Sequence, residues 1–233
     1  MLASTLLGLD PPVLPVHRLV RTAGLFGISE GSARTALSRM AAAGEVVADG
    51  GSYRLAGRLL DRQRRQESGR RPVRRRWRGD WLQAVVVADR RSAGDRAELR
   101  SALTGARLAE WREGVWIRPD NLGRPELPET VADHVEWATA RPDRPPALWD
   151  LDGWASRARR LLDRLDATPL DGTDDLAPGF VLSAAVVRHL AADPLLPVEL
   201  LAPSWPGDEL RRAYDTWDRD WRALLAAWHR SQA

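Results

Sequence analysis

The pattern of hydrophobic and polar positions predicts two short helices near the start of the chain. From Leu14 to Phe26, apolar side chains share one face of a helix, and basic and polar side chains share the other. The segment Glu30 to Ala43 sorts in the same way. Its buried face is expected to hold Ala33, Ala36, Leu37 and Met40. Because Ser29 is a favoured N-cap residue and Gly44 a helix stop, we predict a helix-turn-helix.

A hairpin is predicted directly after these helices. The stretches 45–48 and 52–55 flank Asp49-Gly-Gly51, a sequence typical of tight turns. A hairpin packed behind a recognition helix is the wing of a winged helix-turn-helix, which we expect to occupy residues 1–56. The arginine-rich segment 57–80 follows as a predicted linker helix.

A different pattern begins at Trp81 and predicts a middle domain over residues 81–152. Strands are expected at 81–87, 108–111, 115–118 and 147–149, and helices at 95–103 and 128–140. The order strand–helix–strand–strand–helix–strand is that of the ferredoxin-like fold. We therefore expect a ferredoxin-like βαββαβ domain here.

The last part of the chain, residues 153–233, is predicted to be a helical domain. The segment Pro178 to Ala192 is apolar on almost every side, which is typical of a buried helix. From Asp208 to Trp228 an apolar stripe repeats at steps of four and three. That stripe is either the last wall of the C-terminal core or a dimerisation surface. The fold class expected from all parts is α+β.

Charge separates the two ends of the chain. Residues 1–80 carry 15 arginines against 7 acidic residues, a net charge of +8, whereas residues 81–233 carry 20 against 25, a net charge of −5. A basic end beside an acidic body is expected when that end meets a polyanion. The chain has no cysteine, which excludes disulfides and thiolate chemistry and fits a reducing cytoplasm. With no secretion signal at its start and no membrane-length apolar run, we expect a cytoplasmic protein.

The outward face of the second predicted helix fits the major groove of DNA. Small and hydroxylated residues, among them Gly31, Thr35 and Ser38, lie on this face, and Arg34 and Arg39 flank it. Small residues let a helix approach the bases, hydroxyl groups bond base edges or phosphates, and guanidinium groups bind guanine or phosphate. The residues predicted to contact double-stranded DNA are Ser29, Ser32, Arg34, Thr35, Ser38, Arg39, Ser52, Arg54 and Arg58. The alternative is a protein–protein adaptor built on the same winged fold, without DNA binding.

Several segments together resemble the PaaX family of transcriptional regulators. They are 19–30, 33–40, 43–45 and 53–58 near the start, 112–119 in the middle, and 180–189, 193–197 and 213–217 near the end. The resemblance implies a homodimeric repressor that binds an inverted-repeat operator and releases it on binding an aryl-CoA thioester. It also implies that residues 29–43 form the recognition helix. The chain is shorter than the phenylacetate-responsive members, so the identity of the effector is not carried over.

An effector site, if present, is expected in the tryptophan-rich part of the chain. All eleven tryptophans lie at or beyond Trp77. Trp116 and Arg118 alternate to one side of a predicted strand, and Arg112 is near them in sequence. An aromatic platform beside guanidinium groups suits an aryl or acyl group carried by CoA. The alternative is that these tryptophans fill the core.

No pattern of an enzyme stands out. The four histidines are dispersed without metal-ligand spacing, no glycine-rich phosphate loop occurs, and no serine lies in a nucleophile elbow. We therefore expect no catalytic residue, no metal and no cofactor. The distant alternative is a metal-dependent nuclease, because the middle domain looks like the small ferredoxin-like proteins of CRISPR adaptation and Asp89 follows its first strand.

Overall fold

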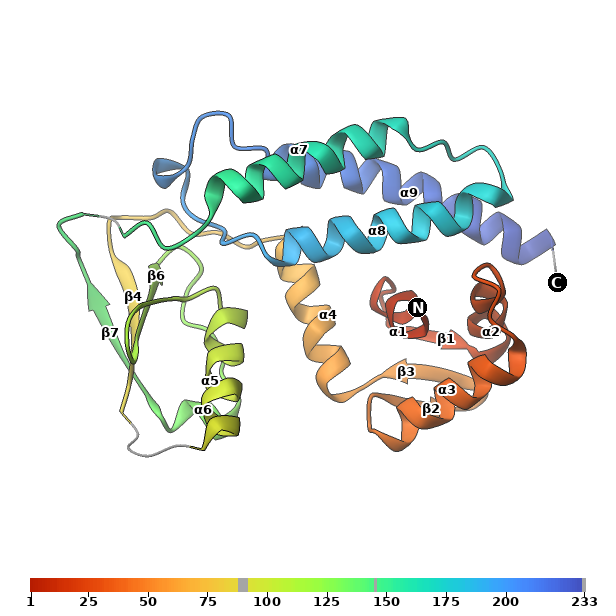
Figure 1. The fold of residues 1–233 in the computed structure, drawn as a ribbon, viewed down its shortest axis with the longest axis horizontal. Helices are drawn as coiled ribbons and strands as arrows, with labels where there is room; N and C mark the ends of the chain where they lie inside the picture. Colours follow the sequence, from red (N-terminus) through yellow and green to blue (C-terminus); the bar gives the residue numbers. More distant parts are fainter. Residues whose placement is uncertain (88–91, 145, 232–233) are drawn as a thin grey trace. The chain divides into compact units, whose positions relative to one another are not determined.

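The computed structural model describes residues 1–87, 92–144 and 146–231. It is a mixed α+β fold with two antiparallel sheets among the described residues, which confirms the predicted class (Figure 1). Its contacts divide the chain into two compact units. The first comprises Met1–Arg71, Ser156–Ala192 and Pro206–Ala233, and the second comprises Pro72–Ala155 and Asp193–Trp205. No helix in the described part of the chain is both long and apolar enough to cross a membrane.

These units do not follow the four consecutive segments expected from the sequence. The first unit combines residues 1–71 with most of the C-terminal helical segment, and residues 193–205 join the middle segment. Long-range packing between helices produces this grouping, and local sequence patterns carry no signal for such packing.

The first unit begins with a small helical bundle closed by a sheet. In chain order its elements are α1 (Leu2–Leu7), β1 (Val13–Pro15), α2 (Val16–Gly24), α3 (Glu30–Ala42), β2 (Val46–Asp49) and β3 (Ser52–Leu55). The predicted hairpin is present, with Asp49 opposite Ser52 at its turn. β1 was not predicted; it pairs with β3, so the strand order is β1-β3-β2. Buried Leu6, Leu19 and Leu37 join α1, α2 and α3 in one core.

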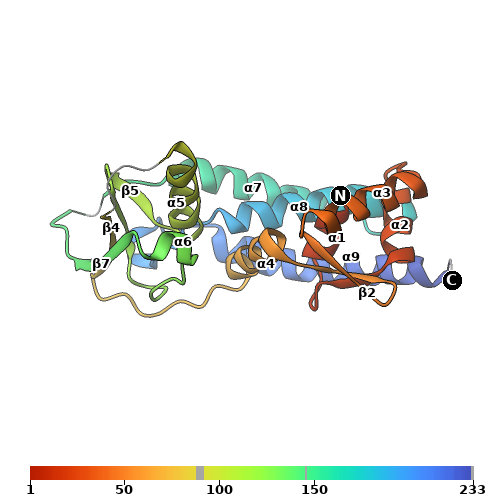
Figure 2. The same ribbon diagram turned by 90° about the horizontal axis from the view of Figure 1, so that it is seen from below.

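Long helices complete the first unit. They are α4 (Gly57–Arg70), the part of α7 (Leu151–Ala167) from Ser156 onward, α8 (Leu176–Ala191) and α9 (Gly207–Ser231), with the short η1 (Thr173–Asp175). In both views α7, α8 and α9 run alongside one another (Figures 1 and 2). α4 contacts α8 so closely that a Cβ added at Gly69 would lie 2.5 Å from the carbonyl oxygen of Leu190. Only glycine fits there without displacing backbone.

The apolar stripe of α9 forms a wall of this core. Leu210, Tyr214, Trp217 and Trp221 are buried, whereas Trp228 near the helix end is half-buried. Of the two alternatives left open by the sequence, the packing supports a core wall over most of the stripe. α8 was expected to be buried on almost every side, but it is buried along one face only. On its other face Val181 is 53% exposed.

The second unit is a four-stranded antiparallel sheet with helices. Its elements are β4 (Trp81–Val86), α5 (Ala93–Gly105), β5 (Ala109–Arg112), β6 (Val115–Pro119), α6 (Glu129–Ala132), β7 (Val135–Ala140) and η2 (Val198–Leu200). The strand order is β5-β6-β4-β7. Ala84, Leu103 and Trp116 are buried in the core of this unit.

The element order matches the prediction, but its last helix and strand were placed wrongly. The helix predicted at 128–140 is a single turn, α6, followed by β7, and residues 147–149 form no strand. Val135, Trp137 and Thr139 alternate along β7, which pairs with β4 over six residues. Period-two alternation over only six residues is a weak sequence signal. Trp149 instead stacks on Trp81, with ring centroids 6.4 Å apart.

Candidate nucleic-acid interface

The local sequence fixes α3 at its N-terminal end and on its buried side. The Ser29 hydroxyl accepts a hydrogen bond from the Ser32 amide at 3.3 Å, as expected of an N-cap. On the inner face Ala33 and Leu37 are fully buried, and Ala36 and Met40 pack against the same core. The predicted N-cap and buried face of this helix are therefore both present.

The outer face of α3 is exposed and carries small polar groups. Gly31, Thr35 and Ser38 are all exposed. The Thr35 hydroxyl donates to the Gly31 carbonyl at 2.8 Å, and the Ser38 hydroxyl donates to the Arg34 carbonyl at 3.1 Å. Since each hydroxyl uses its proton within the helix, its oxygen still faces outward as an acceptor. The face is smooth enough for close approach by another molecule.

Two arginines border this face, and one of them is paired with a nearby carboxylate. Arg34 pairs with Glu30 at 2.8 Å, and both side chains are more than half exposed. Arg39 is exposed and makes no ion pair within the described ranges. Exposed pairs contribute about 1 kcal/mol or less, so Arg34 can exchange Glu30 for a phosphate at little cost.

The remaining predicted contacts lie on the hairpin and at the start of α4. Arg54 on β3 pairs with Asp49 at 2.7 Å beside the hairpin turn, and Ser52 is half-buried on the same strand. Arg58 pairs with Glu45, the residue that links α3 to β2. Ser32 is exposed, and the Ser29 hydroxyl donates to its side-chain oxygen at 3.0 Å. The structure thus places the predicted residues on α3, on the hairpin and at the start of the next helix.

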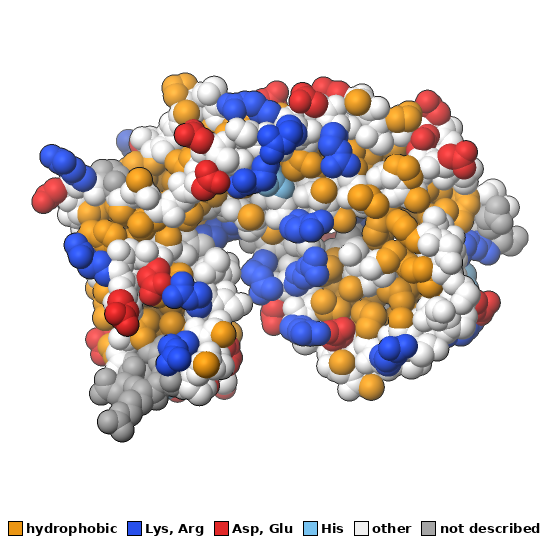
Figure 3. All heavy atoms as spheres, in the orientation of Figure 1, with side chains coloured by type: hydrophobic (Ala, Val, Ile, Leu, Met, Phe, Trp, Pro, Cys, Tyr) orange, Lys and Arg blue, Asp and Glu red, His pale blue; other side chains and the backbone are white. Residues whose placement is uncertain are grey.

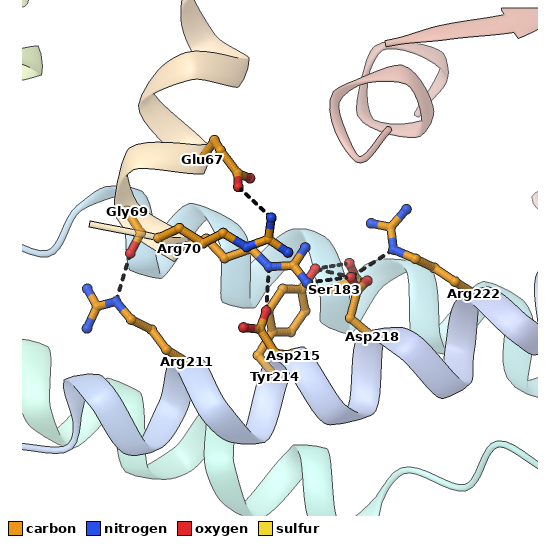
Figure 4. A network of polar contacts seen from close by, with 10 residues as sticks. Glu67, Gly69, Arg70, Ser183, Arg211, Tyr214, Asp215, Asp218 and Arg222 are labelled. Carbon is orange, nitrogen blue, oxygen red and sulfur yellow. Dashed lines mark hydrogen bonds and ion pairs between the residues drawn. The ribbon is translucent and has the colours of Figure 1, made fainter. Parts of the chain in front are cut away.

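A polar network between α4, α8 and α9 was missed by sequence reasoning (Figure 4). Arg70 of α4 contacts Asp215 at 2.6 Å and Asp218 at 3.0 Å. Asp218, only 1% exposed, also pairs with Arg222 at 2.8 Å and accepts from the Tyr214 hydroxyl at 3.2 Å. The signal available was a carboxylate on the buried side of an amphipathic helix, at the position that follows Trp217.

The electrostatics of this network favour a charged Arg70 and a neutral Tyr214. Burial alone would lower the pKa of Arg70, but Asp218, Asp215 and Tyr214 outweigh it and raise that pKa above its ordinary value. Burial and the charge of Asp218 raise the pKa of Tyr214. The Tyr214 hydroxyl therefore remains a proton donor at neutral pH and lies 2.8 Å from the Ser183 hydroxyl.

Of the three residues predicted to bind an effector, Trp116 and Arg118 are buried in the second unit, and Arg112 is exposed. Trp116 is 3% exposed and packs in the core of the second unit. Arg118 is also buried; it donates to the carbonyls of Pro119 and Gly123, and burial lowers its pKa to about 10. Arg112 is exposed on β5, near the Trp111 ring. Trp116 has the packing role that the sequence left open as the alternative.

Asp89, on which the nuclease alternative depends, lies outside the described residues. Within the residues that are described, no group of three or more histidine, aspartate or glutamate side chains is placed to hold a metal ion. No residue of the described chain is thus singled out here as a metal ligand.

Comparisons with known proteins agree with the resemblance seen in the sequence. The family profile of PaaX-like proteins matches residues 2–59, which contain α1 to β3. The structure of the uncharacterized protein Rv0674 from Mycobacterium tuberculosis is similar to this one, with a TM-score of 0.72 and 41% sequence identity. The likeness covers 96% of this chain and 95% of that one. No curated protein matches the chain in sequence. Residues 2–59 thus form a PaaX-like domain, and the family match extends no further along the chain.

Proposed function

We propose that this protein is a DNA-binding transcriptional regulator. Residues 1–56 act as a winged helix-turn-helix, in which α3 is the recognition helix and the β2–β3 hairpin is the wing. The second unit has the strand order of a ferredoxin-like domain and belongs to the rest of the protein, outside the winged helix-turn-helix. The match of residues 2–59 to the PaaX-like family supports this function.

The observation that carries the proposal is the exposed face of α3. Its centre is glycine and hydroxyl groups with outward acceptors, and its borders are Arg34 and Arg39. A helix of this kind can enter the major groove without steric conflict and present guanidinium groups to guanine or phosphate. A surface for a protein partner would be expected to expose larger apolar side chains at its centre.

Charge supports the same assignment. The excess of arginine lies in residues 1–80, and Figure 3 shows basic side chains gathered over α4, next to the proposed DNA-binding elements of the same unit. Neutralising phosphates releases counterions, so affinity for DNA is expected to fall steeply with salt.

Repression, dimerisation and release by an effector form the rest of the proposal. The resemblance to the PaaX family supports a homodimer on an inverted-repeat operator, because two-fold symmetric proteins read two-fold symmetric sites. The same resemblance supports release by an aryl-CoA or acyl-CoA effector.

Fluorescence anisotropy with DNA from upstream of the gene tests the proposal, using a shuffled sequence as the control. We expect nanomolar affinity for one palindromic site and a steep loss of affinity with salt. Arg39→Ala should relax the preference between the two DNAs, whereas Arg65→Ala should weaken both about equally. Arg212→Ala, an exposed change on α9, is the matched control. Absence of salt-sensitive binding would favour the protein–protein adaptor.

A further inference from the structure

A cavity of about 980 Å³ lies within the first unit, where α1, α2 and α4 meet α8 and α9. All five helices contribute lining residues, and α3 contributes none among the described residues. Pockets that hold small organic ligands have volumes of roughly 300–1,000 Å³. The proposed DNA-binding face therefore does not account for this cavity, which is large enough for a ligand.

The wall of the cavity is basic. Among the described residues, eight arginines line it against four carboxylates. Four of these arginines are exposed and form no ion pair within the described part of the chain: Arg18 on α2, Arg62 on α4, Arg188 on α8 and Arg219 on α9. Guanidinium groups gathered from four helices without carboxylate partners favour a negatively charged ligand.

A second part of the wall is apolar and aromatic. Phe180 and Val187 of α8 face the cavity together with Trp221 and Leu225 of α9. The rings of Phe180 and Trp221 are 6.1 Å apart, so they form a continuous apolar surface. A simple inorganic anion would leave this surface in water, whereas a ligand with an apolar group would cover it.

The network of Figure 4 forms the rigid part of the lining. Arg70, Ser183, Tyr214, Asp218 and Arg222 all line the cavity. Because Asp218 binds both guanidinium groups, they are held in fixed positions, and each keeps further N–H donors for another acceptor. Donors that are already ordered lose little entropy when a ligand binds.

We propose that this cavity binds an organic anion that carries an apolar group, and that binding alters the affinity for DNA. The second half of this inference rests on the proposed function. The ligand would contact α2, which packs against α3, and at the same time α8 and α9. It therefore links the recognition helix to the C-terminal helices of the same unit. This site is distinct from Arg112, Trp116 and Arg118, which do not line it.

Isothermal titration calorimetry with octyl phosphate tests the site in the full-length protein. Inorganic phosphate supplies the charge alone, and 1-octanol supplies the apolar group alone. We expect one molecule of octyl phosphate per chain, and affinities at least about tenfold weaker for each half-ligand. The double variant R188Q/R219Q should weaken octyl phosphate at least about tenfold by removing two charged donors. R212Q/R230Q, which changes two exposed arginines of α9 outside the cavity, should bind as the wild type does.

The outcomes separate the site from the proposed function. Equal binding of 1-octanol, no binding of octyl phosphate, or unchanged binding by R188Q/R219Q would overturn the site. Anisotropy with the operator DNA then tests the regulation: octyl phosphate should shift the DNA affinity of the wild type and leave that of R188Q/R219Q unchanged. An unchanged DNA affinity in the wild type would overturn the regulatory role. Failure to bind any DNA would reject the proposed function, while the calorimetry would still decide whether the cavity is a site.

Discussion

Two arginine–carboxylate pairs of this protein differ sharply in their surroundings: one lies on α3 and the other between α4 and α9. Around α3 the pair Arg34–Glu30 is more than half exposed on both sides. Between α4 and α9 the side chains of Arg70 and Asp218 are 16% and 2% exposed, and further hydrogen bonds complete the network. Exposed pairs exchange partners at little cost, whereas buried pairs fix one geometry. The same residue types thus leave the arginine on α3 free to change partners and hold the one on α4 in place.

The largest effect on stability is expected when the buried pair is broken. Asp218→Ala leaves Arg70 and Arg222 without their shared carboxylate, and the loss of one partner of a buried pair costs about 3 kcal/mol. Urea unfolding followed by circular dichroism measures the change. Asp49→Ala removes the partner of Arg54 on the surface and should cost less than about 1 kcal/mol. Equal losses in the two variants would remove the distinction between the regions.

A medium effect is expected from pH, through His229 on α9. Burial and the charges of Arg18, Arg21 and His17 lower the pKa of His229 to about 4, so it stays neutral in the folded protein. The unfolded chain takes up this proton below its ordinary pKa of about 6.5. Stability should therefore fall as the pH drops from 7 towards 4, by about 1 kcal/mol at pH 5 after allowing for solvent screening.

Thermal unfolding at pH 7 and pH 5 measures this contribution. His229→Gln should reduce the loss of stability between the two pH values. His134→Gln, which replaces an exposed histidine of the second unit, should leave that loss unchanged. If His229→Gln loses as much stability as the wild type between these values, His229 is not the group responsible.

The smallest effect is expected when the exposed pair on α3 is broken. Glu30→Gln frees Arg34 from a pair that is worth about 0.5 kcal/mol, so DNA affinity should rise by about two- to threefold. Anisotropy with operator DNA at low salt measures it. Glu209→Gln, an acidic residue in the first turn of α9 and outside this face, controls for the change in net charge. A fall in affinity would mean that the Glu30 carboxylate itself orders the interface.

The structure of the proposed DNA-binding face was predictable because its signals are local. The N-cap Ser29, the buried face of α3 and the glycine turn of the hairpin depend on residues only a few positions apart. The cavity and the Arg70–Asp218 pair join residues about 150 positions apart, and no local pattern records such contacts. Arg118 shows a further limit of the sequence. Alternation along β6 predicted which side of the strand Arg118 lies on, but it could not predict the backbone carbonyls that bind its buried guanidinium group.

The glycines at both ends of α4 bear on how its length can change among relatives. A Cβ at Gly57 would lie 2.8 Å from the Gly44 carbonyl, and one at Gly69 would lie 2.5 Å from that of Leu190. Between them runs a single helix, in which each inserted residue turns the far end by about 100° and moves it by about 1.5 Å. A single insertion or deletion would rotate one glycine contact out of alignment with the other. Length variation within α4 is therefore expected in steps close to whole turns, with three or four residues gained or lost together.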